Sequence, residues 1–360
     1  MQNHPKFSRS LDRNFVKLLQ KRVRQYFKDN EISTHANRSM VTKTIVMLLL
    51  FLGPIIILCS GIVTSAWMLF LLYITSGFGM AGIGMGVMHD AIHGSYSKHT
   101  KLNTILGYSM NIIGANATVW HLQHNVLHHT YTNIHDADDD LNMPFFLRFS
   151  PHKKKYKIHR FQFIYVWFFY SISTLAWISA KDFVRLTRYR KMGLIENRNK
   201  FYKSLFHLTL WKLAYYSYAI VLPIIVLPFS PWLIILAFIS MHLITGLLIS
   251  CVFQVAHVMP NVDYPLTDDK GEIDNNWLVH QLLTTSNFSP KNKIFSWLIG
   301  GLNYQIEHHL FPNVCHVHYR HISPIVQNTA LEFGIPYNQK STFTEAIADH
   351  IAMLRNLGKQ

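Results

Sequence analysis

The chain contains 360 residues, of which 49% are hydrophobic and only 15% are charged, and its net charge is +15 at pH 7. Globular domains average about 25% charged residues, so this composition, with its long apolar runs, predicts an all-α integral membrane protein. Basic loops against anionic lipid account for the positive charge, and we expect no nucleic-acid partner because no recognition motif accompanies it. The three cysteines offer no CxxC pair, so they indicate neither an iron–sulfur site nor a disulfide framework.

The N-terminal segment, residues 1–43, is polar and basic. Apolar residues recur in it at helical spacing between Val16 and Phe27, which predicts an amphipathic helix at a surface. The first long apolar run begins only near Ile45, whereas a secretory signal has its apolar core close to the N-terminus. We therefore expect no cleaved signal and a cytoplasmic N-terminal segment.

Four apolar runs predict membrane-spanning helices at residues 45–63, 67–88, 213–227 and 232–255, and the first of them is about long enough to cross a bilayer. The link inside each pair of runs is short and uncharged, as expected for turns on the outer side. The second run ends in a GxxxG pattern at residues 82–86, which allows another helix to approach closely.

Two further apolar segments, residues 102–117 and 161–180, are expected to form helices lying in the membrane interface. Basic clusters flank the second segment on both sides, so a crossing there would leave one basic loop outside, against the positive-inside rule. The membrane domain then covers residues 44–325, and residues 326–360 form a cytoplasmic helical tail. Both termini and all the histidine motifs described below are expected on the cytoplasmic face of a bacterial inner membrane or the endoplasmic reticulum.

Histidine motifs follow the apolar runs. His89 and His93, in HDAIH, come directly after the second run and are four residues apart, a spacing that places both side chains on one face of a helix. His124, His128 and His129 form HNVLHH, in which the first two have the same spacing. Histidine is the commonest metal ligand, so both motifs indicate metal binding.

A third motif, QIEHH, contains His308 and His309, and His257 stands alone at the end of the fourth run. Together with the first two motifs these make about eight imidazoles, enough for two metal ions in a cytoplasmic histidine-rich domain. Zinc sites usually stop at four ligands and often include cysteine, whereas an all-nitrogen site with open positions suits iron that activates oxygen. That chemistry is needed where the substrate has no polarised bond, as in a lipid chain.

Other polar residues near these motifs have two interpretations. The acidic loop at residues 135–140 is either a solvated surface or a source of hydrogen bonds to ligand imidazoles. His316, His318 and His321 are interpreted as a polar surface loop, and His242 in the fourth run is expected to face the bundle interior. The residues that could either bind a metal or stand beside a ligand are Asp90, His121, His280, Gln305 and Glu307.

The order HDAIH, HNVLHH and QIEHH between pairs of apolar runs resembles the membrane fatty-acid desaturase family, over roughly residues 45–325. By that likeness the seven histidines of the three motifs bind a di-iron centre, and His257 matches the family's isolated extra ligand. Gln305, which opens the third motif, is similar to the front-end subgroup (delta-6-like, linoleoyl-CoA desaturase-like). Those enzymes insert a double bond between an existing one and the carboxyl end of the acyl chain.

The resemblance implies two iron ions, O2 as co-substrate and a cis double bond introduced into an acyl-CoA or an acyl-lipid. Many front-end enzymes also carry a fused cytochrome b5 domain with a His-Pro-Gly-Gly motif. The only early His-Pro here is His4-Pro5, and no glycines follow it. Electrons are therefore expected from a separate carrier protein, such as cytochrome b5, a ferredoxin or a similar protein.

Three other functions fit parts of the pattern. A fatty acyl hydroxylase or other oxygenase on the same di-iron scaffold would share all three motifs. An intramembrane zinc protease is disfavoured because Asp90 stands where the HExxH motif has glutamate. A histidine-rich metal transporter would need ionisable residues along the spans, yet the apolar runs contain little beyond His242 and Gln254.

Overall fold

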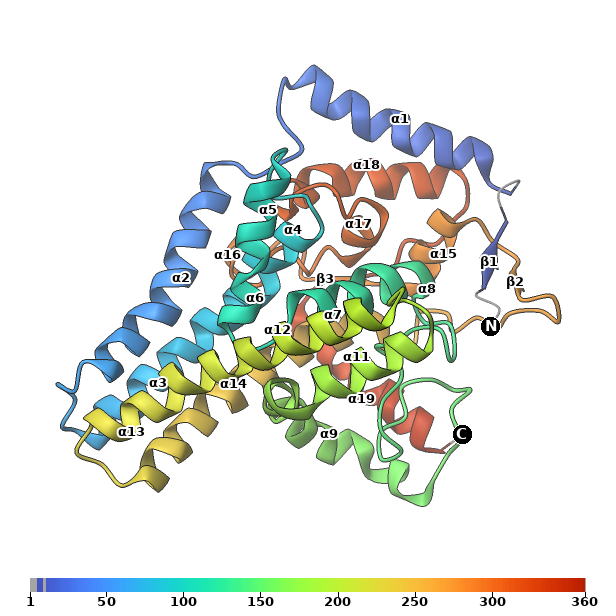
Figure 1. The fold of residues 1–360 in the computed structure, drawn as a ribbon. Coiled ribbons are helices and arrows are strands. Elements are labelled where there is room, and N and C mark those ends of the chain that lie inside the picture. The colour runs from blue at the N-terminus through green and yellow to red at the C-terminus, as the bar shows by residue number, and fades with distance from the viewer. Residues whose placement is uncertain (1–4, 9–10, 360) are drawn as a thin grey trace.

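The computed structural model describes residues 5–8 and 11–359, so His4 of the early His-Pro pair lies outside the described residues. One end of the molecule consists of long helices, and the other contains long and short helices together with loops (Figure 1). Four helices are long and apolar enough to cross a membrane, which confirms the all-α membrane fold. They are Arg38–Cys59, Ala66–Ile92, Arg198–Val226 and Pro231–His257.

The first two spans are α2 (Arg38–Cys59) and a continuous helix made of α3 (Ala66–Gly82), η1 (Ile83–Val87) and α4 (Met88–Ile92). They pack along each other, because small residues let their backbones meet. A Cβ on Gly79 would collide with the backbone of Phe51, and one on Gly82 would collide with the Met47 side chain. The expected close approach therefore occurs, but the tightest backbone contact lies one turn before the GxxxG pattern.

The third span is longer than the sequence predicted. It consists of α12 (Arg198–Tyr216), η5 (Ser217–Val221) and α13 (Leu222–Val226), whereas the apolar run was expected to begin at residue 213. Lys212 directly precedes the predicted run, and its ammonium group is buried and donates to Asp182 at 2.7 Å. The fourth span, α14 (Pro231–His257), agrees closely with its prediction.

The two segments predicted to lie in the interface are broken helices. Residues 102–117 form α5 (Thr100–Gly107), α6 (Ser109–Ile112) and the start of α7 (Ala117–His121). Residues 161–180 fall in a helix pair, Lys157–Ser171 and Ser173–Lys191, that bends by 56° at its break. The pair comprises η3 (Lys157–Phe161), α9 (Gln162–Ser171), α10 (Ser173–Ala176), η4 (Trp177–Lys181) and α11 (Asp182–Lys191).

The predicted amphipathic helix near the N-terminus is α1 (Arg13–Asp29), and it buries Phe15, Leu19, Val23 and Phe27. Its apolar face packs on the protein itself, against α18 (Tyr319–Glu332), as the upper part of Figure 1 shows. The helix thus covers the histidine-rich end of the molecule.

Two pairs of short parallel strands tie distant segments together at that end. Strand β1 (Lys6–Phe7) pairs with β2 (Glu272–Ile273), and β3 (Asn287–Phe288) pairs with β4 (Gln339–Lys340). Helix α18 runs without a break across residue 325, where the tail was expected to begin. The remaining elements are η2 (Leu122–His128), α8 (His129–Tyr131), α15 (Trp277–Thr284), α16 (Lys293–Leu298), α17 (Gln305–Leu310), η6 (His316–His318) and α19 (Phe343–Lys359).

Candidate metal centre

The eight histidines from the three motifs and the fourth span converge on one place in the fold. His89, His93, His124 and His308 form one group, in which one ring nitrogen of each lies within 4.8 Å of those of the others. We call this the first histidine group. The second histidine group consists of His128, His257 and His309, and one ring nitrogen of each again lies within 4.8 Å of those of the others. His129 stands between them and forms a third such cluster with His308 and His309.

The first five residues of HNVLHH lie in a π-helix, η2, rather than in the regular helix that the spacing predicted, and His129 begins α8. A π-helix bonds residue i to residue i+5 and often marks a functional site. As a result the partner of His124 is His129, five residues on, with their Nε2 atoms 3.2 Å apart. His128 lies with His257 and His309, and it also forms a cluster with His124 and Asp140, so the motif contributes to both histidine groups.

Ring nitrogens in these groups are buried and lack hydrogen-bond partners. Seven such nitrogens, from six histidines, occur among the described residues. Buried polar atoms almost always have a partner, and leaving one unpaired costs about 1–3 kcal/mol. A cation coordinated by these atoms removes that cost, so the residues fit a metal centre. The nitrogens are His89 Nδ1 and Nε2, His93 Nε2, His128 Nε2, His129 Nδ1, His257 Nε2 and His309 Nε2.

The charge state of these imidazoles also suits metal binding. Burial lowers the pKa of His124, His129, His308 and His309 well below the ordinary value, and neighbouring histidines lower it further. These rings are consequently neutral at physiological pH, which is the form that binds metals.

Comparison with known proteins agrees with this geometry. The model of the fatty acid desaturase family matches residues 65–341. The chain belongs to the fatty acid desaturase family. It is therefore an oxidoreductase that desaturates fatty acids, and its histidine groups fit a histidine-ligated metal centre.

Three relatives are similar along nearly all of this chain. An sn-1 linoleoyl-lipid 6-desaturase from Arthrospira platensis is 33% identical over 343 residues, which cover 95% of this chain and 92% of that protein. A protein of the same name from a Synechocystis species is 32% identical, with 96% of both chains covered. An acyl-lipid (8-3)-desaturase from Physcomitrium patens is 34% identical over 96% of this chain and 72% of its own length.

Hydrogen bonds behind the rings fix the orientation of the desaturase's second histidine group. His309 Nδ1 lies 2.8 Å from Gln281 Oε1, and His257 Nδ1 lies 3.4 Å from the Thr284 carbonyl. Both acceptors require a proton on Nδ1, which leaves Nε2 free to bind metal. In the first group, His308 Nδ1 lies 3.2 Å from the Tyr319 hydroxyl. Sequence reasoning missed Gln281 and Tyr319, because neither belongs to a histidine motif or a periodic pattern.

Of the acidic loop at residues 135–140, one part orients a ligand imidazole and another part is exposed to solvent, so each of the two interpretations holds for some of its residues. Both oxygens of Asp138 lie 3.1 Å from His128 Nδ1, so this carboxylate orients a ring of the second group. Burial alone would lower the pKa of His128, but Asp138 and Asp140 outweigh it and raise that pKa to about 9. This proton must leave when a metal binds. Asp139 instead pairs with arginines of α11, and Asp136 is exposed.

The five residues that could either bind a metal or stand beside a ligand lie in different surroundings. His121 is exposed and belongs to neither group. His280 is buried, but its Nε2 lies 2.8 Å from the Thr132 carbonyl, outside both groups. Glu307 is held by Tyr337 and Asn287, while burial raises its pKa to about 7. Gln305 is 1% exposed and its Nε2 has no partner among the described residues.

Asp90 links the first group to residues that the sequence assigned wrongly. One of its oxygens lies 3.7 Å from His89 Nδ1, and the other lies 2.7 Å from His316 Nδ1. The interpretation of His316 and His318 as a surface loop is therefore wrong, since they are only 5% and 6% exposed. His318 lies 2.9 Å from the His35 carbonyl, and only His321 of that set is exposed. Helix α1 and the α2 segment cover the other two.

His242 faces the bundle interior, as its position in an apolar span required. It is fully buried, and its Nε2 lies 2.7 Å from the Tyr215 hydroxyl while its Nδ1 lies 3.1 Å from Thr174 Oγ1. These bonds satisfy both ring nitrogens within the helix bundle, so the residue needs no functional role.

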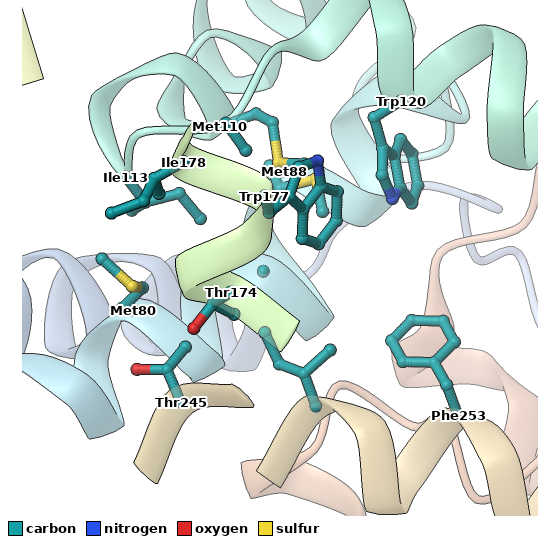
Figure 2. A pocket seen from close by; sticks show the side chains of 13 residues that line it. Met80, Met88, Met110, Ile113, Trp120, Thr174, Trp177, Ile178, Thr245 and Phe253 are labelled. Atoms are coloured by element: carbon teal, nitrogen blue, oxygen red, sulfur yellow. The ribbon is translucent and has the colours of Figure 1, made fainter. Parts of the chain in front are cut away.

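An apolar cavity adjoins the first histidine group (Figure 2), and the space between its lining atoms, including the part open to solvent, is about 420 Å³. Trp120 and Phe253 line the end next to the histidines: the ring centroid of Trp120 lies 4.4 Å from that of His124, and that of Phe253 lies 6.0 Å from it. Figure 2 shows Met80 and Thr245 toward the other end. The cavity thus leads from the metal centre into the apolar spans.

Proposed function

We propose that this desaturase is O2-dependent, acts on fatty acyl chains carried by membrane lipids, and places the new cis double bond between an existing one and the carboxyl end. The names of the similar proteins from Arthrospira platensis and Physcomitrium patens support an acyl-lipid substrate. Gln305 at the start of the third motif supports the front-end position. The observation that carries the proposal is the set of unpartnered ring nitrogens beside an apolar cavity.

The histidine groups divide naturally into two metal sites. Two iron ions bound there would supply the oxidising chemistry that an unactivated C–H bond requires. The first group would hold one ion and the second group the other, with His129 between them. The proposed ligands are His89, His93, His124 and His308 for one site, and His128, His257 and His309 for the other, with His129 as the eighth ligand between them.

The protein's own contribution is to hold the acyl chain and exclude water. An extended chain in the cavity would pass Trp120 and Phe253 within reach of the first group, and the apolar walls give it no other reaction partner. No side chain needs to act as an acid, base or nucleophile. Orientation of the substrate against a reactive centre is the usual role of the protein in such enzymes.

The reaction needs electrons from outside the chain. Each turnover removes two hydrogen atoms from the acyl chain and combines them with O2, two protons and two electrons to give two molecules of water. A separate carrier protein, such as cytochrome b5 or a ferredoxin, would supply the electrons. We place the histidine groups and both termini on the cytoplasmic side, in keeping with the basic residues that flank the spans.

The test is the fatty-acid profile of a host that expresses the chain and is fed linoleate. A new fatty acid with two hydrogen atoms fewer than its precursor is expected from the wild type. It should be absent from a His128→Ala/His129→Ala double variant but present in a His207→Ala variant, which changes an exposed histidine outside both groups. The position of its double bond tests the front-end assignment.

The same experiment separates the desaturase from a hydroxylase on this scaffold. A product with one added oxygen atom and no new double bond would refute the proposal in favour of hydroxylation. If no product forms, metal analysis of the purified protein and its double variant tests the histidine groups independently of substrate and electron donor. Equal metal content in both would refute the ligand assignment.

A further inference from the structure

A second cavity, distinct from the acyl cavity, opens at the surface beside the start of α2 and has about 730 Å³ of empty space. Three cationic side chains line it, Lys43, Lys293 and Arg320, together with His316 and His321. No aspartate or glutamate is among its lining residues. Within the part of the chain that the structure describes, none of the three cations forms a salt bridge within 4.0 Å. The cavity therefore concentrates unpaired positive charge.

Lys43 gives this cavity a buried floor. Its side chain is only 1% exposed, and its Nζ lies 2.6 Å from His316 Nε2 and 5.3 Å from the centroid of the Trp297 ring. Neither neighbour carries a negative charge. The carboxylate of Asp90 lies behind the His316 ring, 2.7 Å from its Nδ1, and attracts Lys43 only across that ring. An anion in the cavity would contact the ammonium group directly and lower the cost of its burial.

Exposed aliphatic side chains stand next to two lining residues of the cavity on α16. Ile294 follows Lys293 and Leu298 follows Trp297, and they are 75% and 47% exposed. Val41 and Ile45 on α2 are also exposed, but they lie two residues from Lys43 and therefore on the other side of that helix. A cationic cavity at the start of a candidate span, with exposed aliphatic side chains beside it, matches a molecule that joins a phosphate group to acyl tails.

The wall between the two cavities is the helix of η1 and α4. Gly84 lines the acyl cavity, whereas a Cβ on Gly86 would lie 3.4 Å from Lys43 Cδ and 3.8 Å from His316 Cε1. The cationic cavity therefore lies on a different side of this helix from the acyl chain. A lipid bound there is not the lipid whose chain occupies the acyl cavity.

We propose that the cationic cavity binds the phosphate headgroup of an anionic membrane phospholipid, as a site separate from that of the substrate. The phosphate would lie over Lys43, with Lys293 and Arg320 at its entrance, and the tails would follow the exposed aliphatic side chains of α16. The bound phosphate also faces the path from Lys43 through His316 to Asp90, which stands behind His89. An anionic lipid thereby stabilises the surroundings of the first histidine group.

Native mass spectrometry of the full-length protein in a neutral detergent tests this site without reference to activity. The protein is titrated with phosphatidylglycerol, with phosphatidylcholine and, in a third arm, with inorganic phosphate. Wild type should retain one phosphatidylglycerol in preference to either other ligand. A Lys293→Gln/Arg320→Gln variant should bind it roughly 25-fold more weakly, since each basic residue near a membrane contributes about fivefold.

A Lys17→Gln/Lys21→Gln variant is the matched control, because it removes the same charge from exposed positions on α1 and should bind as the wild type does. A Lys43→Met variant should lose binding if it folds. If it does not fold, the Lys293→Gln/Arg320→Gln variant, here called the entrance variant, still tests the site. Equal weakening in the entrance and control variants would overturn the proposal, as would retention by the entrance variant at the wild-type level. Retention of inorganic phosphate without lipid would overturn the assignment to a phospholipid.

Discussion

Replacing Asp138 with asparagine should release metal from the second histidine group. Its carboxylate accepts hydrogen bonds from the backbone N–H groups of Asn133 and Asp140, each at 2.9 Å, and contacts His128 Nδ1 at 3.1 Å. An amide has one acceptor oxygen, so at least one donor would face the new NH2 group. Loss of a hydrogen bond to a charged group costs about 1.5–3 kcal/mol, and loss of such a partner usually weakens metal binding about 10–100-fold.

The adjacent Asp139 provides a matched control. It is 1% exposed, against 2% for Asp138, but it pairs with Arg185, Arg188 and the Tyr189 hydroxyl rather than with a histidine. Asp139→Asn should therefore lower stability, by about 3–5 kcal/mol if the buried ion pair is broken. It should leave the metal affinity of the folded protein unchanged.

Competition with a graded series of chelators, read as metal bound per folded molecule, distinguishes the two variants. Asp138→Asn should lose metal at about 10–100-fold lower chelator concentration than the wild type and Asp139→Asn. If both variants lose metal at the same chelator concentration, the carboxylate at 138 acts only through the fold, and the reasoning from its contact with the ring is wrong.

Three further predictions follow from packing, burial and the acyl cavity. Gly79→Ala should lower the free energy of unfolding by about 1–3 kcal/mol through overpacking, and so lower the thermal midpoint in detergent. Gly53→Ala should leave the midpoint unchanged, because no atom lies within 4 Å of its new Cβ. Equal midpoints for the two variants would contradict the close helix contact. Burial lowers the pKa of His350 to about 4. Its contribution to the free energy of unfolding is therefore complete above about pH 6.5 and falls by about 3 kcal/mol as the pH drops from there to 4. Unfolding titrations should show this loss in the wild type and not in a His350→Gln variant. Met80→Trp should narrow the cavity and shift fatty-acid products toward shorter chains, while Phe78→Trp on the lipid-facing side, 50% exposed, should leave the product profile unchanged.

The spans and the main histidines could be predicted because their signals are local. Each apolar run carries its own hydropathy, and His89 and His257 stand at the ends of runs where a membrane face must lie. The start of the third span could not be predicted in this way. The charged Lys212 lies within this span, and the partner that neutralises its charge, Asp182, lies thirty positions earlier in the chain.

The groups that orient the rings depend on tertiary contacts that leave no pattern in the sequence. Gln281 reaches His309 from α15, and Tyr319 reaches His308 from the start of α18. His316 is buried because α2 brings Lys43 against it. A run of histidines in a polar segment reads as surface when taken alone, and only the helix packed over it reverses that interpretation.

Adjacent histidines explain how a few short motifs can serve two metal sites. In an α-helix neighbouring side chains diverge by roughly 100° because there are 3.6 residues per turn. Adjacent imidazoles such as His308 and His309 therefore point to different places, and these two belong to the first and second groups. In HNVLHH the wider π-turn aligns His124 with His129 and leaves His128 free for the second group. A histidine pair without a spacer, repeated in two motifs, is thus better explained by two neighbouring metals than by one.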